Sequence, residues 1–272
     1  MSAPAGWAQE ALLPAQFGAG LLRVDLGPGV VAGFTTRHGG VSPAPWSSLD
    51  LGTGTGDDPA RVRENRARVE QWVGAPVAFA TQVHRDAVLE LGSADLEEWS
   101  REHPPTTAGT ADALVTTTDG LGLGVLVADC VPVLLADPVA RVAAVAHAGR
   151  SGVAAGVVHR ALDALVDRGA TITDVRAAVG PSVCGRCYEV PEELRDQVSA
   201  VVPETWATTS EGTPSLDLPA GVLAQLASRG VTAQHVDRCT LTDGDLFSHR
   251  RATASGTSTG RQAGVVVLAG RS

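Results

Sequence analysis

The chain has 272 residues, 44% of them hydrophobic and 19% charged, a mixture that excludes a disordered or collagen-like protein. Its formal net charge of −9 argues against a broad surface for nucleic acid or anionic membrane, because both need clustered positive potential. All 21 basic residues are arginine, so lysine Schiff-base chemistry is excluded and any phosphate must be held by arginine and backbone amides.

The amino-terminal segment does not have the pattern of a signal peptide. Residues 1–16 contain no basic residue, and Pro4, Glu10 and Pro14 interrupt their apolar positions. No stretch of the chain approaches the roughly 18 apolar residues of a membrane-spanning helix. With four cysteines and no export signal, we expect a cytoplasmic protein with reduced thiols.

Short apolar runs rich in valine predict the strands, and several are continuous, as in strands covered on both faces. The runs span residues 21–26, 30–36, 77–83, 113–116, 121–127, 131–136, 142–146, 175–179 and 264–268. One helix is predicted over residues 59–73, between an N-cap at Asp58 and a stop at Gly74, and a second from about Ser151 to Gly169. Weaker helices are expected at 191–201 and 219–229. Together these elements predict a single α/β domain without repeats, in which residues 101–109 and 250–260 form polar loops beside a cleft.

Three side chains able to bind a metal each lie next to an apolar run, where strand ends bring loops together. These are His84, Cys130 and His147. Two imidazoles and one thiolate suit Zn²⁺, and three protein ligands leave a fourth position for water or substrate. The residues are far apart in the sequence, so two core histidines and a buried thiol explain the pattern equally well.

The residues after His147 suggest an anion site. Gly149, Arg150 and Ser151 lead from a strand into a helix, an arrangement that would present backbone amides and one guanidinium to phosphate. The alternative is that these residues have no ligand and simply form the turn and the helix cap. Arg37 is a second candidate, because it precedes the glycines at 39 and 40. Asp129 beside Cys130 could orient a ligand, act as a base, or be a capping carboxylate.

The remaining cysteines give a weaker signal. Cys184 and Cys187 form a lone Cys-x-x-Cys pair, which supplies at most half of a four-thiolate zinc site. Cys239 could add a third thiolate, but nothing in the sequence requires it. We therefore interpret these thiols as buried or inert.

In combination, these stretches resemble the multicopper polyphenol oxidase (laccase-domain) family, also called the peptidoglycan editing factor or purine nucleoside phosphorylase family. The resemblance covers roughly residues 30–270, and its motifs occur in one order at residues 34–42, 56–59, 82–84, 111–115, 128–134, 147–149, 180–190, 239–240, 247–251 and 259–261. Two positions differ from the usual family motifs. Arg150 follows Gly149 where a tryptophan is common, and His249 replaces a tyrosine.

The resemblance implies mixed β-sheets packed between helices, related to the fold of cysteine-dependent toxin deamidases. It implies a catalytic domain over residues 21–272 after an extension at 1–20, and a zinc site at His84, Cys130 and His147. The implied activity is phosphorolysis of adenosine, inosine, guanosine and methylthioadenosine, with adenosine deamination. A role in removing wrongly built peptidoglycan precursors has also been proposed for the family.

The leading hypothesis is therefore a zinc enzyme acting on purine nucleosides and phosphate, with no nucleic-acid or membrane partner. Its site would comprise His84, Cys130 and His147, with Asp129 nearby and Arg37, Gly149 and Arg150 at the phosphate. A second hypothesis makes Cys130 the nucleophile of a hydrolase that edits peptidoglycan precursors, with His147 as its base. Copper-dependent phenol oxidation ranks third, because the chain has seven histidines and no His-x-His pair. A binding module without catalysis is the fourth alternative, and the sequence does not choose between a monomer and a homodimer.

Overall fold

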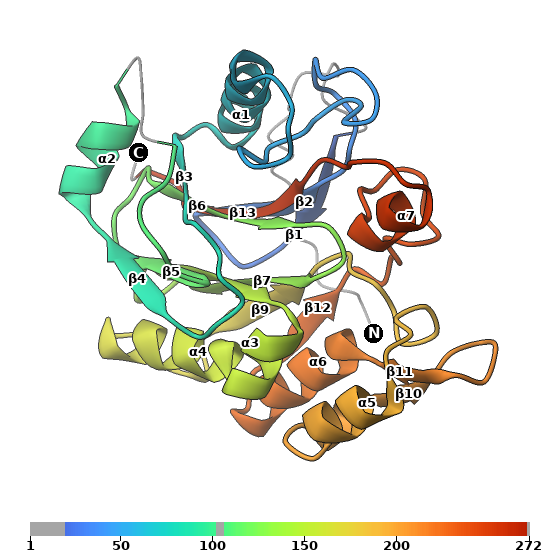
Figure 1. Ribbon diagram of the computed structural model, residues 1–272. Helices are drawn as coiled ribbons and strands as arrows, with labels where there is room; N and C mark the ends of the chain where they lie inside the picture. The colour runs from blue at the N-terminus through green and yellow to red at the C-terminus, as the bar shows by residue number, and fades with distance from the viewer. Residues whose placement is uncertain (1–19, 102–105, 271–272) are drawn as a thin grey trace, which may run out of the picture.

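Two β-sheets lie face to face with helices on both outer sides in the computed structural model, which describes residues 20–101 and 106–270 (Figure 1). One sheet has five strands in the order β1-β2-β13-β6-β3 and the other has six in the order β12-β9-β7-β8-β5-β4, with parallel and antiparallel pairs in both. The prediction of mixed sheets packed between helices is confirmed. Among the described residues, no helix is long and apolar enough to cross a bilayer.

The strands have the following bounds: β1 Leu21–Val24, β2 Val30–Thr35, β3 Val77–Phe79, β4 Val88–Leu91, β5 Ala113–Thr116, β6 Gly122–Val127, β7 Val131–Asp137, β8 Val142–Ala148, β9 Arg176–Val179, β10 Trp206–Thr208, β11 Pro214–Leu216, β12 Ala233–His235 and β13 Gln262–Leu268. The helices are α1 Pro59–Val73, α2 Ser93–Trp99, α3 Arg150–Ala155, α4 Val157–Asp167, α5 Glu192–Ser199, α6 Leu218–Ser228 and α7 His249–Ala254, with a 3-10 turn at Pro203–Thr205. All nine predicted strands are present. The sequence did not predict β4, α2, β10, β11 or β12, which are all short.

The central strands β7 and β8 have continuous apolar sequences because both of their faces are buried. Leu134 and Val145 belong to the core between the two sheets. Their neighbours Leu135 and Ala144 belong to the core under α4 and α6. Successive strand residues alternate between the two faces, so His147 lies on the same side of β8 as Val145, facing the other sheet.

Helix α1 forms where the sequence predicts it. The Asp58 carboxylate accepts the backbone N–H of Ala60 at 2.8 Å, Pro59 occupies the first turn, and Gly74 ends the helix with φ 75°. These local signals fix both ends of the helix without help from the rest of the fold. In Figure 1, α1 lies above the five-stranded sheet, while α3, α4 and α6 lie below the other sheet.

Two predictions about the helices are wrong. The single helix expected from Ser151 to Gly169 is divided into α3 and α4 by Gly156, whose φ of 83° is left-handed and cannot continue an α-helix. Helix α3 is thus only six residues long. The expected polar loop at 250–260 begins within α7, which the Ser248 side chain caps by accepting the N–H of Arg251. Nearly all of the predicted extension at 1–20, and part of the predicted loop at 101–109, lie outside the described residues.

Candidate active site

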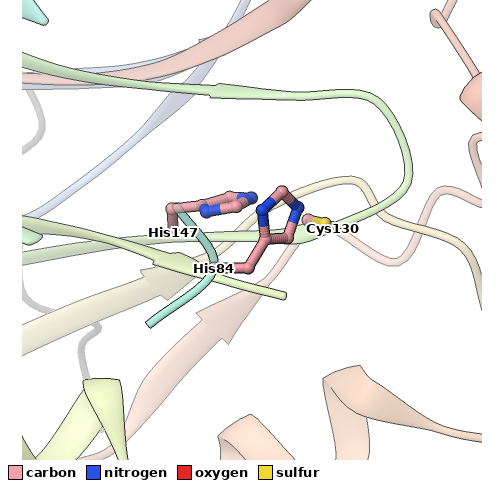
Figure 2. A group of neighbouring side chains, drawn as sticks. All are labelled: His84, Cys130 and His147. Carbon is pink, nitrogen blue, oxygen red and sulfur yellow. The ribbon is translucent and has the colours of Figure 1, made fainter. Parts of the chain in front are cut away.

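His84, Cys130 and His147 come together from three separate segments (Figure 2). Their ligand atoms all lie within 4.8 Å of one another, and the two imidazole rings meet edge to face with centroids 4.8 Å apart. His84 follows β3, Cys130 directly precedes β7, and His147 is the second-last residue of β8. His147 is 2% exposed, Cys130 is half-buried and His84 is exposed, so the cluster opens to one side.

Asp112, just before β5, holds both histidines in place. Its carboxylate accepts the backbone N–H groups of Val83, His84 and Arg85 at 3.2, 2.9 and 2.8 Å. The same carboxylate lies 2.8 Å from Nδ1 of His147. A single buried side chain therefore fixes the loop that carries His84, although His84 has a left-handed φ of 60° that is uncommon for a residue with a side chain.

The bond to Asp112 also determines which nitrogen of His147 faces the cluster. An ionised carboxylate can only accept a hydrogen bond, so Nδ1 of His147 carries the proton that it donates to Asp112, and Nε2 is left for Cys130. Burial raises the pKa of Asp112, but hydrogen bonds from His147 and the N–H of Arg85 outweigh it, so the net pKa is lowered and the group stays ionised. This is the arrangement that orients metal-binding histidines in proteins.

Cys130 and His147 form an acidic thiol and a basic imidazole when no metal is bound. Burial opposes ionisation of the thiol, but the charges and hydrogen bonds of His147 and His84 lower the pKa of Cys130 to about 6. Burial likewise opposes protonation of His147, and Cys130 and Asp112 raise its pKa to about 9. At neutral pH the pair is therefore a thiolate beside an imidazolium.

Gly149 lies directly behind the cluster. A Cβ atom at this position would lie 2.9 Å from Cδ2 of His84 and 3.2 Å from Sγ of Cys130. Both distances are shorter than ordinary contacts between side chains, so any larger residue at this position would require His84 or Cys130 to shift.

The cluster lies at the wall of a cavity of about 1040 Å³. Tyr188 and His249 line this cavity, together with four arginines: Arg66, Arg150, Arg250 and Arg261. Arg66 donates to the carbonyls of Leu51 and Thr106, and Arg261 donates to those of Thr259 and Gly260. These bonds hold the two guanidinium groups against the backbone.

Arg150 and Arg250 are the arginines available to a ligand. The Arg250 guanidinium lies over the ring of Tyr188, 4.8 Å from its centroid, and the charge of Arg150 opposes the rise that burial causes in the pKa of Tyr188. Across the described part of the chain, neither guanidinium forms an ion pair with a carboxylate. Two unneutralised positive charges thus face the same cavity as the cluster.

Arg37 does not line this cavity. It lies at a smaller cavity of about 230 Å³, where its Nε donates to the carbonyl of Ser47 at 2.5 Å and its guanidinium covers the ring of Phe247. Burial and the nearby charge of Arg251 lower its pKa. Arg37 is thus committed to packing beside α7.

Asp129 borders the larger cavity, but both of its oxygens are occupied. One accepts the Thr240 hydroxyl at 2.6 Å and the other accepts the backbone N–H of Arg250 at 2.7 Å. Asp129 therefore fixes the start of α7. Its left-handed φ of 94° lies next to Cys130, so strained backbone occurs at two of the three segments that form the cluster.

Sequence reasoning missed Asp112, Tyr188 and Arg250 as site residues. All three lie within family motifs, and Asp112 is also a carboxylate directly before a buried strand. Their roles depend on contacts between segments far apart in the chain.

Comparison with known proteins identifies the family. A family model described as multi-copper polyphenol oxidoreductase laccase matches residues 31–269. The chain belongs to this family. Two solved structures are similar to it at 30% identity: YlmD from Geobacillus stearothermophilus, with a TM-score of 0.81 over 98% of this chain and 100% of that one, and YfiH from Bacillus licheniformis, with 0.80 over 92% and 97%.

Curated relatives in this laccase family bear the name of one enzyme. A purine nucleoside phosphorylase of Streptomyces griseus is 50% identical over 240 residues, which cover 86% of this chain and 93% of that protein. A purine nucleoside phosphorylase of Mycobacterium tuberculosis is 46% identical over 226 residues, which cover 82% and 87%. The relatives support an enzyme of that kind.

Proposed function

We propose that this protein is a metal-dependent purine nucleoside phosphorylase whose ion is held by His84, Cys130 and His147. The observation that carries the proposal is the position of this cluster on a cavity also lined by Arg150 and Arg250, which form no ion pair with any described carboxylate. The names of the relatives supply the substrate class. We expect adenosine, inosine, guanosine and methylthioadenosine as substrates, with adenosine deamination as a second activity.

The donor set fits zinc. Two imidazole nitrogens and one thiolate match the borderline-soft character of Zn²⁺, and Asp112 supports His147 in the way that zinc-binding histidines are usually supported. When bound, such an ion supplies Lewis-acid polarisation of an oxygen atom. Multicopper chemistry needs several ions. Among the described residues, this is the only group of neighbouring ligands that contains histidine, so copper oxidation is disfavoured.

Phosphate would be bound by Arg250 and Arg150. Both face the cavity that contains the cluster, whereas Arg37 borders the smaller one, so the proposal assigns the main phosphate contacts to this pair. Planar guanidinium groups bind phosphate oxygens in pairs of parallel hydrogen bonds. The six-residue helix α3 is too short to provide a strong dipole, so side chains rather than helix amides would neutralise the anion.

In phosphorolysis the glycosidic C–N bond of the nucleoside breaks, a phosphate oxygen bonds to the sugar carbon, and the purine leaves with a proton. The arginines would align phosphate against that carbon, which is the main task of a protein in such a transfer. In deamination, water replaces phosphate, attacks the ring carbon that bears the amine, and ammonia leaves. Only the first reaction needs the arginines for its nucleophile.

A cysteine hydrolase that edits peptidoglycan precursors is the second candidate, and one observation favours it. Cys130, His147 and Asp112 form a chain of nucleophile, base and orienting carboxylate. The two functions compete for one sulfur atom, because a thiolate bound to zinc is a poor nucleophile. Metal content therefore distinguishes them.

The test uses protein purified without added metal and a Cys130→Ala variant. We expect the wild type to contain zinc at the cluster and to convert inosine and phosphate into hypoxanthine and ribose 1-phosphate. The variant should lose that zinc and the activity, because two imidazoles hold Zn²⁺ much less well than three ligands. Full activity in metal-free protein, or zinc retained at this cluster in the variant, would contradict the proposal.

A further inference from the structure

A second group of potential metal ligands lies outside both cavities. Cys184, Cys187 and Cys239 have sulfur atoms within 4.8 Å of one another, and all three residues are half-buried. The first two belong to the loop between β9 and α5, and the third follows β12. Separate parts of the chain thus bring three of its four cysteines to one point.

Tight backbone turns hold the cysteines in position. The N–H groups of Cys187 and Tyr188 donate to the carbonyl of Cys184 at 2.9 and 3.0 Å, which closes the Cys-x-x-Cys turn. The N–H groups of Thr242 and Asp243 donate to the carbonyl of Cys239 at 3.2 and 2.9 Å. Backbone hydrogen bonds already fix both turns, so binding an ion would require little further ordering of the chain.

Hydrogen bonds also join the two loops side by side. Ser182 and Cys239 form a parallel bridge, in which Ser182 N–H donates to the Arg238 carbonyl at 3.2 Å and Thr240 N–H donates to the Ser182 carbonyl at 3.0 Å. This bridge lies directly beside the sulfur atoms. It sets the distance between the Cys-x-x-Cys turn and the third cysteine.

The three side chains offer a metal only sulfur. Each provides one sulfur atom, and none of the three residues is exposed. Cysteine binds metals as the thiolate, so each thiol would lose its proton on binding. Three soft donors at a single point are matched best by zinc or a similarly thiophilic divalent ion.

We propose that Cys184, Cys187 and Cys239 bind a second zinc ion, separate from the His84 cluster. On binding, each thiol gives its proton to the buffer and each sulfur donates an electron pair to the ion. No fourth histidine, cysteine or carboxylate joins the group within the described residues, so the fourth position is taken by water or a small thiol. No change in oxidation state is involved.

This ion would stabilise two loops that form part of the larger cavity's lining. Val183 and Tyr188, which flank the cysteines of the first loop, line the cavity. Thr240, which follows Cys239, bonds to Asp129, and its carbonyl accepts Arg251 of α7. The second zinc is therefore a structural ion that joins the two loops behind Tyr188 and α7, and the expectation of inert thiols is replaced by this proposal.

The experiment counts ions and identifies their ligands in the full-length protein. Wild type loaded with zinc should hold about two ions per chain, and both Cys130→Ser and the triple variant Cys184→Ser, Cys187→Ser, Cys239→Ser should hold about one. Loaded with Co²⁺, the wild type should show sulfur-to-metal absorption. Cys130→Ser should lose about a quarter of this absorption and the triple variant about three quarters, since they remove one and three of the four sulfur ligands.

A titration of the wild type avoids any problem with a variant that does not fold. Once a chelator has removed the metal, Cys130 and the three cysteines of the second group should all react with a thiol reagent. Added zinc should protect all four thiols. Restoring the second zinc should raise the melting temperature by about 5–15 °C, as expected for an ion present far above its dissociation constant.

Three results would overturn the proposal. They are a single ion in the wild type, a triple variant with unchanged metal content, and a mass showing a disulfide among the three cysteines in protein kept under reductant.

Discussion

The first cluster (His84, Cys130 and His147) and the second cluster (Cys184, Cys187 and Cys239) have similar dimensions but very different surroundings. Both gather three ligands within 4.8 Å. The first opens onto a cavity of about 1040 Å³ lined by arginines. Asp112, which is 1% exposed, supports it through hydrogen bonds to His147 and to the backbone of His84. The second lies outside both cavities, on turns closed by backbone hydrogen bonds. The mixed donors beside open space suit a reacting site, and the all-sulfur group on hydrogen-bonded turns suits a structural one.

The two clusters also differ in backbone strain. His84 and Asp129, at the first cluster, have left-handed φ angles of 60° and 94°. None of the three cysteines of the second cluster has a positive φ. Strained residues persist only where surrounding contacts fix them, as Asp112 does for His84, and they are concentrated at functional sites. Of the two clusters, only the first has strained backbone.

The largest expected difference between the clusters is thiol acidity at Cys130. Its pKa is lowered from 9.0 to about 6, because His147 and His84 outweigh the effect of burial. That shift makes the thiol about a thousandfold more acidic. In metal-free protein, we expect alkylation of Cys130, followed by peptide mass, to rise with pH through an inflection near 6 and to be level by pH 8.

A His147→Ala variant is the control for this measurement. Without the imidazolium, burial is left to oppose ionisation, so the inflection should move upward toward that of an ordinary thiol. An inflection of Cys130 near 8.5 in the metal-free wild type would show that the thiolate–imidazolium pair does not form.

The second expected effect concerns the support beneath the first cluster. Asp112→Asn keeps the size of the side chain, but its amide can present N–H to Nδ1 of His147 and turn the proton to the wrong ring nitrogen. We expect zinc affinity and phosphorolysis to fall by about 10–100-fold, measured by competition with a chelator and by product formation.

Asp137→Asn is the matched control. Asp137 is also a buried carboxylate that accepts three backbone N–H groups, those of Val139, Ala140 and Thr171, but it is not at the cluster. This variant should lose stability and keep its zinc. Equal loss of zinc in both variants would mean that the effect of Asp112 is general destabilisation.

The third expected effect is on phosphate binding, and it distinguishes the arginines of the larger cavity from Arg37 at the smaller one. Replacing Arg250 or Arg150 by alanine should raise the KM for phosphate by about 10-fold, as expected for the loss of a charge-assisted contact, and should affect deamination less. Arg37→Ala, at the smaller cavity, should change the KM for phosphate far less. A larger rise in the KM for phosphate at Arg37 than at Arg250 would show that phosphate binds at the loop of residues 37–40.

Local sequence signals predicted the elements that local chemistry determines. Helix α1 was predicted with both ends because Asp58, Pro59 and Gly74 act within one or two residues of those ends. The break between α3 and α4 was missed although Gly156 was visible in the middle of the expected helix. The apolar spacing continues across this glycine, but its left-handed backbone ends the helix.

The sequence brings out the three candidate metal ligands that the fold gathers, but not the residues that support them. His84, Cys130 and His147 each adjoin an apolar run, and the ends of neighbouring strands meet in space. The role of Asp112 depends on donors at Val83, His84, Arg85 and His147, which are distant in the sequence until the sheets form. The sequence offers Cys239 as a possible third thiolate but does not require it, because its approach to the Cys-x-x-Cys turn depends on a bridge to Ser182 that forms only in the fold.

The smallest expected effect tests how closely the first cluster is packed. Gly149 has φ −75° and ψ 168°, which any residue can adopt, so alanine there would act through its Cβ alone. That atom would lie 2.9 Å from Cδ2 of His84 and 3.2 Å from Sγ of Cys130. His84 is exposed and can shift outward by a few tenths of an ångström. The expected result of Gly149→Ala is a loss of about 1 kcal/mol of zinc binding, or roughly fivefold in affinity.

Gly54→Ala is the matched control for this last measurement. Gly54 lines the same cavity, its φ is not left-handed, and a Cβ there would have no heavy atom within 4 Å. Its zinc affinity should equal that of the wild type in the same chelator competition. If Gly149→Ala also binds zinc like the wild type, His84 and Cys130 hold the ion farther apart than their present approach, and the space behind the cluster is not a constraint on the metal.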